Sequence, residues 1–303
     1  MKQQTLAKTY HFEGIGLHTG KYAHMSICPA PADSGIIFVR TDQEGVAIKA
    51  TAENVTNTAR STTLSNSRGI SVVTVEHLLS ALTGLGIDNA VIEIDNVEVP
   101  ILDGSARPYV EAITADSLVL LPQERHYIEI KEEIEIKYEN TGSYVKIVPA
   151  DEPSFDLTVD FNSRVLGVQH ADWNLERDYA HEIAPCRTFV FFHELEFLVS
   201  QGLVKGGDMD NAIVVVENPT TPEQIAHIAK IFRAPKLSVS EGYLSNLSLH
   251  FPDECGRHKL LDLIGDMRLC GGYLRAKVIA YKPGHGINTA AAKAVRVAAF
   301  KNH

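Results

Sequence analysis

The sequence predicts an α+β protein made of two similar αβ units, and three observations carry this prediction. Two leucine-rich helical segments, residues 74–84 and 254–266, each contain a histidine and are each followed by a turn and a strand. The strands expected around them mostly alternate apolar and polar residues, as in sheets with one face in water. The 303 residues are also enough for two domains of about 150 residues each.

The two helical segments match in register. When His77 is aligned with His258, the leucine-rich stretches that follow coincide, and Gly84 aligns with Gly265. Strands are expected after the two helices, at residues 89–94 and 274–281. This correspondence indicates an internal duplication. A chance match between two leucine-rich helices that precede strands is the alternative.

Residues 120–125 are polar, contain a proline and separate two patterned stretches, so we expect a domain boundary there. The first domain then covers residues 1–124 and the second covers residues 125–303. Residues 186–217 show the pattern strand, helix, strand, which predicts a small βαβ insert in the second domain. Further elements are expected as strands at 23–29, 36–40, 70–73, 127–137, 143–148 and 155–161, and as helices at 106–114 and 289–300.

Composition and charge exclude several classes of protein. The formal net charge is −10 and no run of lysine or arginine occurs, so a nucleic-acid partner is not expected. The N-terminus lacks the apolar core of a secretory signal, and no apolar stretch is long enough for a bilayer, so we expect a cytoplasmic protein. The four cysteines show no CxxC spacing, which argues against a disulfide framework or a zinc ribbon.

His258 and Asp262 stand four residues apart, so on a helix both side chains project from one face. Imidazole and carboxylate groups bind divalent metals, and a catalytic zinc usually takes three protein ligands. The second piece, Glu76 and His77, lies where a strand gives way to a helix that Thr74 is expected to cap, and it can supply the third ligand. A solvated ion pair between His258 and Asp262 is the alternative.

Two further groups of residues attract attention. His285 lies between glycines on a loop expected after a strand, where it suits a general acid; an ordinary exposed histidine is the alternative. The βαβ segment carries more large apolar residues than so small a unit needs. Either they pack on the main domain or some line an apolar channel, and the sequence leaves both open. These residues are Phe189, Phe192, Leu195, Leu198 and Val204.

Several long motifs, in order along nearly the whole chain, resemble the UDP-3-O-acyl-N-acetylglucosamine deacetylase family of lipid A synthesis. The motifs are Thr74-Val75-Glu76-His77-Leu78-Leu79-Ser80-Ala81-Leu82, Gly86-Ile87-Asp88-Asn89, Arg187-Thr188-Phe189, residues 257–266, and Gly284-His285 with Asn288. The resemblance implies two similar two-layer αβ domains, each with a small insert, that pack their helices around a catalytic zinc, with Fe²⁺ as an alternative metal.

Residue roles follow from the resemblance by motif position. It implies that His77, His258 and Asp262 bind the zinc ion, that Glu76 is the general base, and that His285 is the acid or electrostatic partner. It further implies supporting roles for three residues: Asp266 would orient His285, Thr188 would stabilise the oxyanion, and Lys259 would contact the substrate.

The resemblance also implies the substrate and the reaction. The N-acetyl group of UDP-3-O-acyl-N-acetylglucosamine would be hydrolysed and acetate released, which is the committed step of lipid A biosynthesis. Phe161 would stack on the uracil, and the acyl chain would pass through the second insert. Of the two interpretations of the apolar residues, the resemblance therefore favours an apolar channel, lined by Phe189, Phe192, Leu195 and Val204. We expect a monomer with at most a peripheral membrane contact.

Two departures and two alternatives accompany this interpretation. The resemblance implies that Ser61 stands near the metal at a position where relatives often have cysteine. This sequence also stops soon after the helix expected at 289–300, whereas some relatives carry a fused dehydratase domain. One alternative is a zinc hydrolase of another kind, such as a peptidase, although HExxH and GxSxG are absent. The other is a non-catalytic αβ protein that binds an acyl chain or a nucleotide. Retention of Glu76 beside a metal set argues against it, since a binding protein needs no general base.

Overall fold

The computed structural model describes residues 1–201, 204–234 and 236–300. Its first domain is built on a five-stranded sheet in which β9 is the central strand. Strand β9 runs antiparallel to β3 and parallel to β4, while the outer pairs β2–β3 and β4–β5 are antiparallel. In spatial order the strands are β2 (Tyr10–Ile15), β3 (Tyr22–Pro29), β9 (Ala90–Ile94), β4 (Ile36–Arg40) and β5 (Val46–Lys49).

The main sheet of the second domain repeats this topology strand for strand. Its central strand, β20, runs antiparallel to β13 and parallel to β14, and the outer pairs are again antiparallel. The short strand β11 (Tyr127–Glu129) also pairs with β20, in parallel. In spatial order the strands are β12 (Ile134–Tyr138), β13 (Ser143–Pro149), β20 (Tyr273–Tyr281), β14 (Ser154–Asp160) and β15 (Val168–Asn174). The predicted internal duplication is therefore confirmed.

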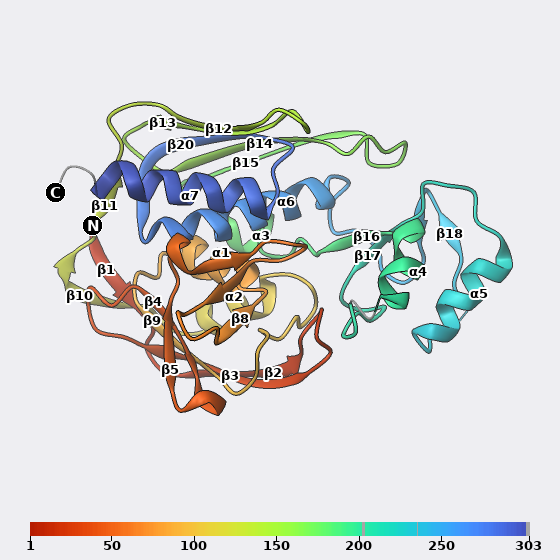
Figure 1. The fold of residues 1–303 in the computed structure, drawn as a ribbon, viewed down its shortest axis with the longest axis horizontal. Coiled ribbons are helices and arrows are strands. Elements are labelled where there is room, and N and C mark those ends of the chain that lie inside the picture. The colour runs from red at the N-terminus through yellow and green to blue at the C-terminus, as the bar shows by residue number, and fades with distance from the viewer. Residues whose placement is uncertain (202–203, 235, 301–303) are drawn as a thin grey trace.

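Helices occupy corresponding places in the two repeats. Helix α1 (Glu76–Gly84) precedes β9 as α6 (Glu254–Met267) precedes β20, and α2 (Arg107–Thr114) and α7 (His285–Phe300) follow these strands. Figure 1 shows the helices stacked between the two main sheets, so that each domain has one sheet layer and one helix layer. The fold is α+β, as predicted.

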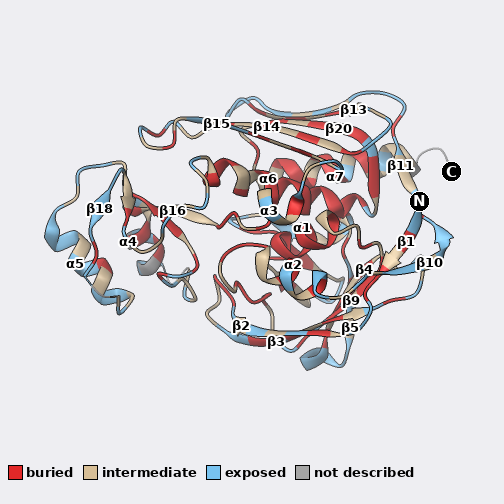
Figure 2. Ribbon diagram, turned by 180° about the vertical axis from the view of Figure 1, so that it is seen from behind, coloured by how far each residue is buried: buried red, intermediate tan, exposed pale blue. Residues whose placement is uncertain are grey.

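Apolar side chains of both domains fill one continuous core between the two sheets. Figure 2 shows buried residues in the helices between the two sheets, above all in α1 and α6. The leucine-rich second helical segment has an apolar stripe that is fully buried, because the sheet of the second domain covers one side of α6 and α1 covers another. The stripe consists of Leu260, Leu261, Leu263, Ile264 and Met267.

Each domain carries an insert at the same point of the repeat, before the helix that leads to the central strand. The first is a three-stranded sheet of β6 (Val55–Asn57), β7 (Thr63–Ser65) and β8 (Ser71–Val73). The second contains β16 (Phe189–Phe191), α4 (Phe192–Ser200) and β17 (Ile213–Val215), and the two strands are parallel, as predicted for a βαβ unit. A short helix, α3 (Tyr179–Glu182), leads into this insert.

Several expectations about local structure were wrong. The second insert extends past residue 217. Strands β18 (Val239–Ser240) and β19 (Tyr243–Leu244) complete its four-stranded sheet, and helix α5 (Pro222–Ile231) precedes them. The stretch 120–125, where a domain boundary was expected, is largely strand β10 (Val119–Glu124), which pairs with the N-terminal β1 (Lys2–Thr5). The single strand expected over 127–137 is interrupted between β11 and β12.

Thr74 does not cap α1. Its hydroxyl donates to Glu98 Oε1 at 2.8 Å, and the N-cap position is Val75, which makes no side-chain capping bond. The four cysteines are all free, which agrees with the prediction of no disulfide framework. Among the helices in the described residues, none has the length and apolar character that crossing a membrane requires.

Candidate metal centre

The site forms where α1 and α6 cross. A Cβ atom placed on Gly265 would lie 2.0 Å from the backbone oxygen of Glu76, so only glycine permits this close approach of the two helices. Because the backbones are so close, His77 of α1 and His258 of α6 face each other, and their ring centroids are 4.9 Å apart in an edge-on arrangement. The crossing thus joins one half of the site from each domain.

His77, His258 and Asp262 offer three ligand atoms that all lie within 4.8 Å of one another, and all three residues are buried. Nε2 of His77 and Nε2 of His258 lie 3.6 Å and 3.4 Å from Oδ1 of Asp262. Among the described residues, this Oδ1 atom is buried without a hydrogen-bond partner. A buried carboxylate oxygen that faces two imidazole nitrogens suits a divalent metal ion, so these residues fit a metal site.

Neighbouring groups hold two of the ligands in place. Nδ1 of His258 lies 3.0 Å from the carbonyl oxygen of Cys186, which favours the tautomer that leaves Nε2 free to bind a metal. The ammonium group of Lys259 donates to the other carboxylate oxygen of Asp262, Oδ2, at 2.8 Å. Each of these two ligands is therefore oriented by its second polar atom.

Electrostatics keep the ligands in the protonation states that metal binding needs. Burial lowers the pKa of His258 to about 4, so its imidazole is neutral at pH 7. Burial alone would raise the pKa of Asp262, but the charge of Lys259 opposes it, and the pKa stays well below its usual range. The carboxylate is thus ionised at neutral pH.

A second group of titratable side chains faces the three ligands. Nε2 of His285 lies 3.9 Å from Oε1 of Glu76, and its Nδ1 lies 3.0 Å from Oδ2 of Asp266. Asn288 also donates to Oδ2 of Asp266, at 3.0 Å. The flanking glycines predicted a loop position for His285, but it is the first residue of α7 and is mostly buried. The helix extends further toward the strand than its alanine-rich part indicates.

Burial raises the pKa of Glu76, although the charge of His285 acts in the opposite direction. Burial alone would lower the pKa of His285, but the carboxylates of Asp266 and Glu76 outweigh it and raise this pKa to about 9. The side chains are therefore arranged as a carboxylate with increased basicity beside an imidazolium ion.

The three metal-ligand residues, together with Glu76 and His285, line a pocket of about 200 Å³. A neighbouring, more apolar pocket of about 100 Å³ lies in the second insert and shares Thr188 and Phe189 with it. Leu195 and Val204 line this apolar pocket. Phe192 lies away from both, in a separate pocket beside His193 and Glu217.

The remaining predicted residues lie beside these pockets. Phe161 packs edge-on against Phe189, with ring centroids 5.5 Å apart. Thr188 is fixed through its backbone, since its N–H donates to the carbonyl oxygen of Gly104 at 2.8 Å and its carbonyl accepts from the N–H of Ile213 at 2.9 Å.

Sequence reasoning missed three residues of the site. His18 and Arg60 line both pockets, and Nε2 of His18 is buried without a hydrogen-bond partner in the described part of the chain. His18 lies in a glycine-rich segment, residues 12–20, in which glycines are expected to serve tight backbone turns and no site residue was predicted. Thr62 donates its N–H to Oε2 of Glu76 at 3.0 Å and its hydroxyl to Oδ1 of Asp266 at 2.5 Å. No sequence pattern marks Thr62, because both contacts depend on the tertiary fold.

Comparison with known proteins extends over nearly the whole chain. The family model of LpxC, UDP-3-O-acyl N-acetylglycosamine deacetylase, matches residues 3–229 and 237–296. A protein of Saccharophagus degradans named UDP-3-O-acyl-N-acetylglucosamine deacetylase is 39% identical over 292 residues, which cover 95% of this chain and 88% of that protein. A protein of the same name from a Nostoc species is 38% identical over 307 residues and is covered completely, as is this chain.

The chain is also similar to longer proteins. A protein of Porphyromonas gingivalis named bifunctional enzyme LpxC/FabZ is 41% identical over 297 residues, 97% of this chain. The chain spans only 64% of the length of that relative. The residues matched by the family model include both domains and every residue of the metal centre. The chain therefore belongs to the LpxC family of UDP-3-O-acyl N-acetylglycosamine deacetylases.

Proposed function

We propose that this chain hydrolyses the N-acetyl group of UDP-3-O-acyl-N-acetylglucosamine and releases acetate, as a zinc-dependent enzyme of lipid A biosynthesis. The family and the names of the relatives supply the substrate. The observation that supports the reaction is the convergence of three metal-ligand side chains with Glu76 and His285 around one pocket. The domains proposed at residues 1–124 and 125–303 each contribute part of this arrangement.

His77, His258 and Asp262 would hold the metal ion. Two imidazoles and one carboxylate suit zinc and also accept Fe²⁺. When bound there, zinc lowers the pKa of a water molecule and polarises the acetyl carbonyl group.

Glu76 is proposed as the general base. The N–H of Thr62 fixes Oε2, which leaves Oε1 on the side of His285. Because burial raises the pKa of Glu76, its carboxylate accepts a proton from the attacking water more readily than an exposed carboxylate does. The water oxygen then bonds to the acetyl carbon, and negative charge develops on the carbonyl oxygen.

His285 and Thr188 are proposed to act on that charge and on the leaving group. The imidazolium of His285, oriented by Asp266, provides positive charge beside the reacting carbonyl, and the Thr188 hydroxyl donates to the oxyanion. When the C–N bond breaks, the amine takes a proton from His285 or from Glu76, and acetate leaves. Lys259 is proposed to contact the substrate while its ammonium group stabilises the Asp262 carboxylate.

The apolar pocket beside the centre is the proposed site of the acyl chain, with Phe189, Leu195 and Val204 along its wall. Phe192 lines a different pocket and is not needed for this passage. Phe161 is proposed to pack against the uracil ring, next to Phe189. We further propose that the chain acts as a monomer and touches the membrane surface only to collect a lipid-tailed substrate.

The test combines metal analysis with acetate release from the UDP-linked substrate, for the wild type and for His258→Ala. We expect about one zinc ion per chain and activity in the wild type, and loss of both in the variant. His181→Ala is a matched control, because His181 also lies beside an aspartate, Asp178, but on the exposed surface. A wild-type protein that binds the substrate without metal or activity would instead support a binding protein.

A further inference from the structure

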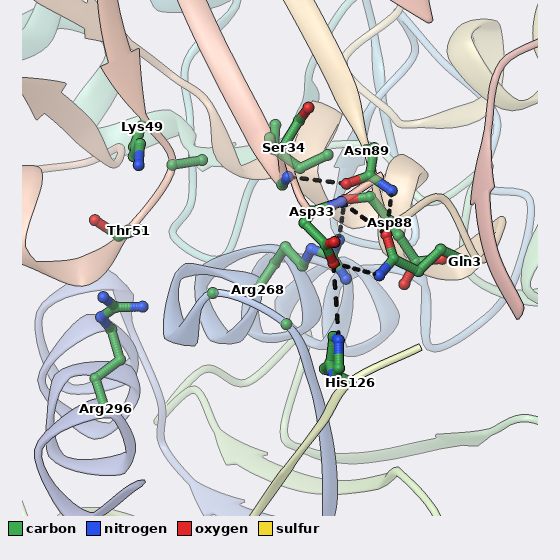
Figure 3. Close-up of a pocket in the computed structure, with 15 residues that line it drawn as sticks. Gln3, Asp33, Ser34, Lys49, Thr51, Asp88, Asn89, His126, Arg268 and Arg296 are labelled. Carbon is green, nitrogen blue, oxygen red and sulfur yellow. Dashed lines mark hydrogen bonds and ion pairs between the residues drawn. The ribbon is translucent and has the colours of Figure 1, made fainter. Parts of the chain in front are cut away.

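A pocket of about 330 Å³ lies at the junction of the two domains. Its walls come from the loops beside β4 and β9, the end of β5, the turn after α6, and α7. Figure 3 shows this pocket, with Arg268 between the Gln3–Asp33–Asn89 network and the pair Lys49 and Arg296. None of its described lining residues lines the pocket at the metal centre.

Arg268 follows directly after α6 and is only 4% exposed. Its Nη2 atom donates to the carbonyl oxygens of Ile87 and Asp88, at 3.0 Å and 3.1 Å, and the guanidinium lies 4.4 Å from the ring centroid of Tyr273. Nη1 is buried without a hydrogen-bond partner in the described part of the chain. A buried cation usually has an anionic partner, because its desolvation is costly.

No carboxylate among the described residues lies within ion-pair distance of Arg268. The nearby side chain of Asp88 is already used, since Nε and Nη2 of Arg125 donate to its two oxygens at 2.7 Å each. The N–H of Gln4 donates to the same carboxylate. The Asp88 side chain therefore has little capacity left for a second guanidinium, and the charge of Arg268 is not paired within the described protein.

Two further cations face the same space. Arg296 donates from Nη1 to the carbonyl oxygen of Cys270 at 2.9 Å and from Nε to Glu53 at 2.5 Å, which fixes its guanidinium at the rim. Gly271 has a φ of +99°, and a Cβ atom there would lie 2.4 Å from Nη1 of Arg296. A side chain at this position would therefore require the guanidinium of Arg296 to move.

Lys49 is exposed at the end of β5, and Figure 3 shows its amino group directed toward Thr51 and Arg296. This amino group makes no hydrogen bond or ion pair among the residues that the structure describes. Lys49, Arg268 and Arg296 thus gather around one pocket of a chain whose net charge is −10. The arrangement favours an anionic ligand.

We propose that this pocket binds a phosphate group, either as free phosphate or as the phosphomonoester of a small molecule, with Arg268, Arg296 and Lys49 as its cationic partners. Two guanidinium groups match the several oxygens and the double negative charge of phosphate better than the single charge of chloride. The pocket is larger than a phosphate ion, which leaves space for the organic part of an ester. Binding would join α6 and α7 to the first sheet and stabilise the domain junction.

Thermal unfolding of the metal-loaded protein, titrated with potassium phosphate and with potassium chloride of equal ionic strength, tests this proposal. We expect Tm to rise with phosphate beyond the effect of chloride, because a ligand that binds only the folded state stabilises it. Lys49→Met and Arg296→Gln should each weaken the apparent phosphate affinity by about tenfold. Because Lys49 is exposed, Lys49→Met should not impair folding, so a weaker affinity in this variant reports on phosphate binding. Lys131→Met removes the same charge from an exposed loop and should leave the affinity unchanged.

A second arm replaces phosphate by glycerol 3-phosphate. Tighter binding of the ester would identify a phosphorylated small molecule as the ligand, and equal binding would identify the phosphate group alone; both agree with the proposal. No phosphate-specific rise in Tm would overturn it. So would a rise that Lys49→Met and Arg296→Gln both leave unchanged, since that ligand would be bound elsewhere, for example at the metal centre.

Discussion

Several reactive side chains of the metal centre are held by a second polar group of the protein. The ammonium group of Lys259 donates to Asp262. Thr62 contacts both Glu76 and Asp266, so it links the proposed base to the residue that orients the proposed acid. Such contacts fix the reacting groups before a substrate arrives, so little reorganisation is needed during the reaction.

The role of Glu76 can be separated from that of the metal ligands. Glu76→Gln keeps the shape of the side chain but removes its ability to accept a proton, so kcat should fall by about 10²–10⁴-fold. Metal content should stay at the wild-type level, and both quantities are measured on the same preparation. Glu152→Gln, at an exposed position, is the control. Loss of the metal from Glu76→Gln would mean that Glu76 is itself a ligand.

The pH dependence of the reaction should report on His285. Its pKa is raised to about 9, so the imidazolium persists at neutral pH, and activity that needs its charge is lost as the pH rises through that value. Asp266→Asn removes a carboxylate that raises this pKa. The pH at which kcat/KM falls on the alkaline side should therefore be lower in Asp266→Asn than in the wild type. The measurement is kcat/KM between about pH 6 and about pH 10 for both proteins.

Thr62→Val is the matched control for this measurement. It removes a hydrogen bond to Asp266 but keeps the carboxylate charge beside His285. In this variant kcat/KM should fall on the alkaline side at nearly the same pH as in the wild type. An equal displacement in both variants would show that this fall reports on the structure around Asp266 and not on its charge.

At the scale of elements, the crossing of α1 and α6 decides whether the centre forms. Each helix carries part of the ligand set, and each is the helix that precedes the central strand of its own sheet. Gly265 permits the contact because it has no side chain toward the backbone of Glu76. The duplicated unit thus provides both halves of the site, and the helix crossing brings them together.

Gly265→Ala tests the importance of this contact. Helix propensity alone predicts a gain of about 1 kcal/mol for alanine over glycine. The added Cβ would lie 2.0 Å from the backbone oxygen of Glu76, so we expect a net loss of about 1–3 kcal/mol in the free energy of unfolding. Gly284→Ala is the control, because a Cβ there meets no atom within 4 Å. Denaturant unfolding distinguishes the two outcomes, and a stabilised Gly265→Ala protein would contradict the role of the close contact.

At the scale of the whole molecule, buried polar contacts tie the two domains together at the end where β1 and β10 pair. Arg125 is almost fully buried and donates to Asp88 of the first domain, while its guanidinium lies 4.1 Å from the ring centroid of Tyr273 in the second. The stretch around residues 120–125 therefore contributes to the contact between the two domains.

Arg125→Met should lower the free energy of unfolding by about 3–5 kcal/mol, because it leaves the buried Asp88 carboxylate without its guanidinium partner. Arg275→Met is a close match as a control. Arg275 also pairs with a carboxylate, Glu129, and lies over a tyrosine ring, Tyr127, but both charged groups are exposed. Its loss should cost about 0–1 kcal/mol. Equal effects of the two substitutions on denaturant unfolding would show that burial of the Arg125 pair does not matter.

The sequence by itself determined the repeated αβ unit and the residue types of the centre. Periodicity and spacing are local properties, so His258 and Asp262 could be placed on one helix face, and the match with His77 could be found by alignment. These predictions agree with the helices and with the three ligand atoms that the structure brings together. The βαβ start of the second insert was likewise evident from its pattern of strand and helix.

Only the tertiary structure decided which distant groups meet. The contacts of Thr62 with Glu76 and Asp266, and the pairing of β10 with β1, join residues far apart in the chain, and no local pattern marks such contacts. The same holds for Thr74, whose hydroxyl is taken by Glu98 and so does not cap the helix beside it. Burial and long-range partners outweigh local preference at these positions, because an unpaired polar group inside the protein costs more free energy than a lost helix cap.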